Sequence, residues 1–147
     1  MCADGYILRS FGEEATEIQF EARSTIDVGP AALTDEEREL RRYRLTDLLD
    51  DLRGTSDSVD IVFIASQLLG MTEELALLSE RRWTGAGKWL ARHLENGPDE
   101  FASRLADAFR LLIATDDKQP MIEVASAILD LAGGPLTEGF GGHRPTD

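Results

Sequence analysis

The sequence predicts a mostly α fold: an antiparallel helical bundle of about five helices, preceded by a short β-hairpin. Apolar residues recur at helical spacing in several segments, start and stop signals bound these segments, and the connections between them are short. The chain has 147 residues, of which 42% are hydrophobic and 29% charged, and this composition is typical of one globular domain.

The predicted hairpin lies within residues 5–28, where two short runs alternate apolar and polar residues. In the second run Ile18 and Phe20 are expected to face a core, which places Glu17, Gln19 and Glu21 together on the opposite face. Carboxylates that converge on one face of a strand could contribute to a metal site, and a solvated strand face is the alternative.

The first predicted helix follows this region. Thr34 and Glu37 have the spacing of a capping box, so the helix is expected to begin near Asp35, and Gly54 marks its end. A second helix is expected from about Ser56 or Ser58 to Ser79. Its broad apolar face is predicted to make it the most buried element, and Gly70 within it suggests a closely packed neighbour or a slight bend. The residues expected to form this face are Ile61, Val62, Ile64, Ala65, Leu68, Leu69, Met71, Leu75 and Leu78.

Three more helices complete the prediction. A short one ends near Leu94, and the next, opened by Pro98, has an inward stripe that includes Leu112 and Ile113. The last one has Ile128 and Leu131 facing in, with Gly133 as its stop. The expected domains are a hairpin region over 1–33, a helical bundle over 34–138 and a flexible tail over 139–147.

Composition excludes several classes of function. A formal net charge of -13 argues against general nucleic-acid binding, because a phosphate backbone repels a strongly acidic protein. Cys2 is the only cysteine, and with His93 and His143 it cannot make a Cys/His zinc site, so no metal is expected. No signal peptide is visible and no segment approaches the apolar length of a membrane span, so we expect a cytoplasmic protein without membrane association.

One stretch, "RRWTGAGKWL" at residues 81–90, is basic on an otherwise acidic chain. Its spacing fails the phosphate-loop pattern, because Arg82 stands where a glycine is required and Trp89 replaces the required Ser or Thr. Arg81, Arg82, Lys88 and Arg92 nevertheless form a candidate site for an anionic ligand at a helix start. The alternative is a helix connection in which two tryptophans seal the core and the cations are solvated.

The segments "RRYRLTDLLDDLRG", "RRWTGAGKWLARHL" and "AGGPLTEGF" together resemble the C-terminal part of bacterial nucleotidyltransferase-domain proteins, relatives of the aminoglycoside nucleotidyltransferases. The resemblance covers roughly residues 5–140. It implies that the hairpin is the remnant of a catalytic sheet, in which Glu17 or Glu21 would be the third catalytic carboxylate. It also implies a helical bundle that shapes a substrate pocket, with the basic residues facing the nucleotide or acceptor.

The family's Gly-Ser motif and Asp-x-Asp pair are missing from this chain. The chain alone is therefore expected to be catalytically incomplete, with magnesium and a nucleoside triphosphate binding only if another chain supplies the catalytic half. The expected partners are such a chain or a second copy. A different class of function is a small acidic helical interaction or dimerisation protein, antitoxin-like and without ligand chemistry. An independent enzyme would need Glu17 or Glu21 in one cleft with Arg82 and Lys88.

Overall fold

The computed structural model describes residues 28–85 and 101–137, and eight further residues: Glu17, Ile18, Phe20, Glu21, Arg23, Ser24, Lys88 and Arg92. Four helices lie in the continuous ranges: α2 (Asp35–Gly54), α3 (Ser58–Ser79), α5 (Phe101–Thr115) and α6 (Gln119–Leu131). The described part of the chain contains no strand, and the predicted α class is confirmed.

Short-range signals in the sequence define the starts of α2 and α3. The Thr34 hydroxyl accepts a hydrogen bond from the Glu37 amide at 3.2 Å, and Glu37 Oε2 accepts one from the Thr34 amide at 2.9 Å, which confirms the predicted capping box. The Thr34 hydroxyl also donates to Glu37 Oε2, at 3.1 Å, and the two bonds that Thr34 donates to this carboxylate lower the pKa of the Glu37 carboxyl, because they favour its charged form. At the start of α3, Asp57 Oδ1 accepts from the amides of Val59 and Asp60 at 2.8 and 3.1 Å.

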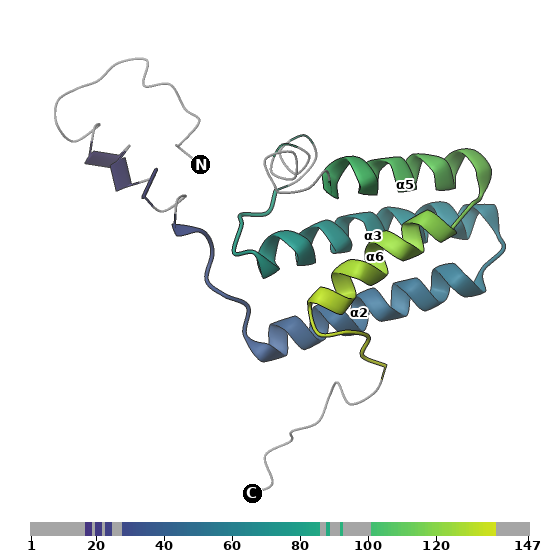
Figure 1. Ribbon diagram of the computed structural model, residues 1–147, viewed down its shortest axis with the longest axis horizontal. Helices are drawn as coiled ribbons and strands as arrows, with labels where there is room; N and C mark the ends of the chain where they lie inside the picture. Colours follow the sequence, from purple (N-terminus) through teal and green to yellow (C-terminus); the bar gives the residue numbers. More distant parts are fainter. Residues whose placement is uncertain are drawn as a thin grey trace, which may run out of the picture.

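The four helices enclose one shared core. α3 and α6 each contact α2 and α5 as well as each other, whereas α2 and α5 do not contact one another within the described residues. Figure 1 shows the result, with α2 along one side, α5 along the other, and α3 and α6 between them. The buried core residues are Leu45, Leu49, Leu52, Ile61, Ala65, Leu68, Leu75, Leu105, Ala108, Leu112, Met121, Val124, Ala125 and Leu129.

The segment after α6 is tied onto α2 by polar contacts. Gly133 and Gly134 have positive φ angles of 120° and 84°, which glycine adopts easily and which turn the chain back toward α2. Arg42 of α2 donates to both of their carbonyl oxygens, at 2.7 and 2.8 Å. The hydroxyl of Thr46, which is buried, accepts from the Leu136 amide at 3.1 Å and donates to the Arg42 carbonyl at 2.8 Å. Two of the sequence segments that carry the family resemblance therefore contact each other.

The second strand of the predicted hairpin is not observed at the residues described there. Glu17, Ile18, Phe20 and Glu21 are helical and exposed, so Ile18 and Phe20 do not face a core. The run from Glu17 to Glu21 alternates polar and apolar residues over only five positions, and a run this short is also compatible with a helix. A strand would have been favoured only if one face of the run were buried. The first strand, most of the predicted helix ending near Leu94 and the tail over 139–147 lie outside the described residues.

Substitution of two buried threonines, Thr46 and Thr72, can measure how much the Thr46–Leu136 hydrogen bond contributes to stability. Thr46→Val leaves the Leu136 amide without its acceptor, and we expect it to lower the free energy of unfolding by about 1–2 kcal/mol. Thr72 is also buried, but its hydroxyl donates only to the Leu68 carbonyl of its own helix, so Thr72→Val should cost less than about 0.5 kcal/mol. Urea unfolding of both variants measures the difference, and equal losses would contradict this role for Thr46.

Candidate functional site

The basic residues 81 and 82 are held by contacts within the chain. Arg81 has a positive φ of 55° and its Nε donates to the Pro30 carbonyl at 3.3 Å. Gly29 passes so close that a Cβ there would lie 2.2 Å from the Arg81 carbonyl oxygen. Arg82 Nη1 lies 3.6 Å from the Glu80 carboxylate. The end of α3 is therefore a packed corner against the chain segment that enters α2.

The other predicted site residues are described individually. Lys88 and Arg92 are helical and exposed, and so are Glu17 and Glu21. Most of the neighbours of these four residues in the sequence lie outside the described residues. Anion binding by residues 81, 82, 88 and 92, and catalysis by either glutamate, stay predictions.

The most distinctive surface of the described helices is an uncovered apolar face on α3. Val59 is 61% exposed, Val62 44% and Phe63 67%, although α3, like α6, contacts all three of the other described helices. On α5, which lies beside α3, Ile113 is 45% exposed. Val62 and Ile113 were both predicted to face inward, and that prediction was wrong. Leu131 of α6, also predicted inward, is exposed as well.

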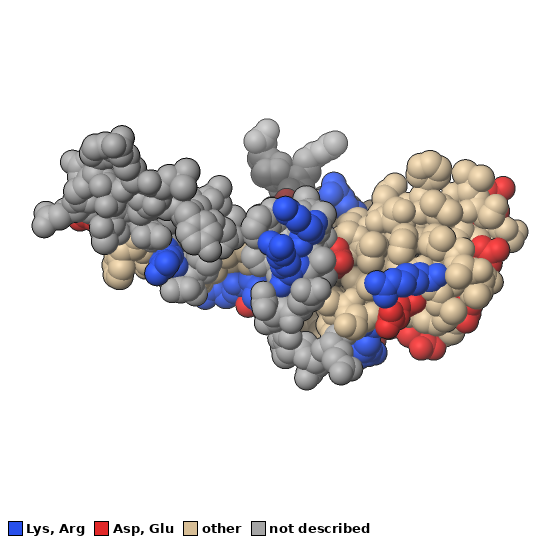
Figure 2. All heavy atoms as spheres, turned by 90° about the horizontal axis from the view of Figure 1, so that it is seen from above, with Lys and Arg blue, Asp and Glu red and all other residues tan. Residues whose placement is uncertain are grey.

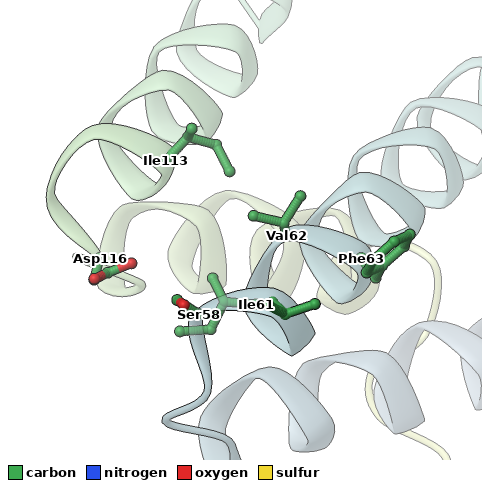
Figure 3. A pocket seen from close by; sticks show the side chains of 7 residues that line it. Ser58, Ile61, Val62, Phe63, Ile113 and Asp116 are labelled. Atoms are coloured by element: carbon green, nitrogen blue, oxygen red, sulfur yellow. The ribbon is translucent and has the colours of Figure 1, made fainter.

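An open pocket of about 530 Å³ lies between the start of α3 and the end of α5. Figure 3 shows Val62 and Ile113 pointing toward each other across it, with Asp116 at one end and Phe63 at the other. We call Val59, Val62, Phe63 and Ile113, together with this pocket, the α3–α5 surface. Apolar side chains left in water at a hollow of this kind are typical of a surface that binds another molecule.

Acidic residues stand beside the α3–α5 surface. Asp57 and Asp60 lie at the start of α3, and Asp116 and Asp117 lie directly after α5; all four are exposed. Figure 2 shows Asp and Glu side chains along the right-hand end of the helical domain, where α3 begins and α5 ends in Figure 1. We call Asp57, Asp60, Asp116 and Asp117 the acidic end. Within the described part of the chain none of the four forms an ion pair.

The exposed face of α3 becomes covered toward its C-terminal end. Ser66 and Gly70 continue it at helical spacing and are exposed, whereas Glu73 is half-buried and Leu77 is buried outside the shared core. A Cβ at Gly70 would meet no described atom within 4 Å, so the expected close neighbour is not found there. Burial raises the pKa of Glu73 to about 7, because the charged carboxylate loses hydration.

Phe63 and Asp116 were not among the residues predicted to form a functional site. A signal was present in α3, whose apolar residues extend around more of the helix than a single core-facing stripe requires. For Asp116 there was no comparable signal, because its place at the pocket depends on how α5 packs beside α3.

Two further observations bear on the class of site. Among the described residues, no three His, Cys, Asp or Glu side chains come together in a way that could hold a metal ion. In the same part of the chain, α3 is long and apolar enough to cross a membrane by length and composition, which departs from the expectation that no segment approaches such a span. The core helix of a globular protein passes the same test, and 33% of the apolar window of α3 is buried.

Comparison of the chain with protein-family models, with curated proteins and with solved structures finds no match. The geometry of the described residues therefore carries the functional argument.

The half-buried Glu73 should make stability depend on pH. Because its pKa is raised in the folded chain, the folded state binds more protons than the unfolded state between the ordinary value of 4.5 and about 7, and stability is lost as pH rises through that window. Glu73→Gln should therefore stabilise the protein by about 1 kcal/mol at about pH 8, a figure reduced for solvent screening, and by much less at about pH 5. Urea unfolding at both pH values measures this, and an equal effect at both would contradict the assignment.

Proposed function

We propose that this chain is a small acidic helical interaction protein, built as an antiparallel helical bundle, that binds another polypeptide through the α3–α5 surface. In this proposal it has no ligand chemistry of its own. Its role is that of an antitoxin-like or dimerisation partner, and the bound polypeptide covers apolar area that the four helices leave open.

The observation that carries the proposal is the exposure of three large apolar residues on one turn of α3. Val59, Val62 and Phe63 are spaced i, i+3 and i+4, which is the spacing of a helix face that packs against a neighbour. Exposing such a face costs free energy in water, and a second polypeptide that covers it regains roughly 25 cal/mol for each Å² of apolar surface removed from water. The adjoining pocket provides a hollow into which a partner side chain can insert.

The nucleotidyltransferase resemblance stays a prediction that no observation on the described residues favours. Arg81 and Arg82 contact Pro30 and Glu80 within the chain. Arg42 and the glycines after α6, which lie in two of the resembling segments, hold the end of α6 onto α2. These hydrogen bonds and this ion pair give Arg42, Arg81 and Arg82 a structural role within the chain.

Site-specific photo-crosslinking tests the proposed function. Position 63 receives the photoreactive residue p-benzoylphenylalanine in place of Phe63, and the protein is irradiated in the cells that encode it. Phe63 is exposed, so the replacement does not disturb the core. We expect a discrete crosslinked polypeptide, identified by mass spectrometry, because the partner covers this turn of α3.

The matched control carries the same photoreactive residue in place of Leu131, an exposed apolar residue at the end of α6. We expect position 131 to give no discrete adduct. No adduct at position 63, or the same adducts at both positions, would exclude the α3–α5 surface as a binding surface.

A further inference from the structure

We propose that the occupant of the α3–α5 surface is an amphipathic α-helix of another protein, with Lys or Arg residues beside its apolar face. This inference rests on the proposed function and specifies its partner class. Two independent properties of the surface support it: the shape of the apolar face on α3 and the sign of the charge next to it.

The apolar face fits a helix because it is itself a helical ridge. Val59, Val62 and Phe63 project from one turn of α3, and Ser66 and Gly70 follow on the same side. Gly70 is exposed, and a Cβ there would meet no described atom within 4 Å, so the described residues do not cover this part of α3. A second helix laid along α3 can approach closely over the two small residues and insert apolar side chains between Val62 and Ile113.

The charge favours a basic partner. The chain has a formal net charge of -13, and the acidic end lies beside the pocket. Asp116 lines the pocket directly, and Asp60 lies three residues before Phe63, at the spacing that places two side chains on the same side of a helix. The Lys118 ammonium group is close by, but it donates to the Thr55 carbonyl oxygen. Lys or Arg on the partner would pair with carboxylates that have no ion pair within the described residues.

The same charge disfavours two other occupants. A second copy would bring two acidic ends and two strongly negative chains together. An anionic membrane surface would repel the chain for the same reason, and insertion of α3 across a bilayer would remove it from its contacts with α2, α5 and α6. A basic amphipathic helix matches both the apolar and the acidic parts of the surface.

Binding of two designed peptides to the full chain tests the inference. Both peptides are about 18 residues long, roughly 27 Å as helices, with the same leucine face; one carries Lys on its flanks and the other carries Glu. Fluorescence anisotropy with labelled peptides measures the dissociation constants. We expect the Lys peptide to bind at least about tenfold more tightly than the Glu peptide, and added salt to reduce the difference.

Two double variants of the chain distinguish the effect of the aspartates beside the pocket on peptide binding from the effect of the overall negative charge. Asp60→Asn with Asp116→Asn should weaken binding of the Lys peptide by about tenfold. Asp116 has a positive φ of 59°, which Asn tolerates well, so the backbone is preserved. The control is Asp47→Asn with Asp51→Asn, two exposed residues of α2 that form no ion pair in the described part of the chain. It removes the same charge and should weaken binding by no more than about twofold. Phe63→Ser should weaken binding of both peptides.

The possible outcomes distinguish this inference from the proposed function. If position 63 crosslinks to a polypeptide but the two peptides bind equally, or neither binds, the basic amphipathic helix is overturned and the interaction surface stands. If light scattering shows a dimer that Phe63→Ser dissolves, a second copy is the occupant and the inference is overturned. Binding to phosphatidylcholine vesicles that Phe63→Ser abolishes would overturn it in favour of a lipid surface.

Discussion

The structure depends on α3 packing against α2, α5 and α6 at once while one of its own faces stays uncovered. Ile61, Ala65, Leu68 and Leu75 place one side of α3 in the shared core, and this side supplies the hydrophobic stabilisation that holds four helices together. The opposite side carries Val59, Val62 and Phe63 in water. This second apolar side lies outside the shared core.

The rest of the described chain fixes α3 in that position. Arg41 of α2 donates to the Glu74 carboxylate of α3 at 3.0 Å, and Asp57 caps the first turn of α3. Arg42 and Thr46 hold the segment after α6 against α2, so that α6 stays in contact with both α2 and α3. Charged and hydroxyl groups thus satisfy backbone groups at the starts of α2 and α3 and in the segment after α6, and the core itself is almost wholly apolar.

The helix boundaries could be predicted from the sequence because they depend on local chemistry. The Thr34 and Glu37 pair, Gly54 and Gly133 each act within a few residues of the helix end that they mark. Burial could not be predicted in the same way. Whether Val62 and Ile113 face the core or solvent depends on how α5 is placed along α3, and periodicity alone contains no information on that placement. The prediction of a strand at Ile18 and Phe20 was wrong for a related reason, since a short alternating run is compatible with a helix as well as with a strand.

Hydroxyl-radical footprinting of the isolated chain, read out by mass spectrometry, measures directly whether α3 has one covered and one solvent-exposed apolar face. Phe63 and Val62 should be oxidised readily, while Leu68 and Leu75 of the same helix should be protected, because only the latter two lie in the core. When a partner helix is added and binds, the oxidation of Phe63 should decrease selectively. Protection of Phe63 equal to that of Leu68 in the isolated monomer would contradict the account.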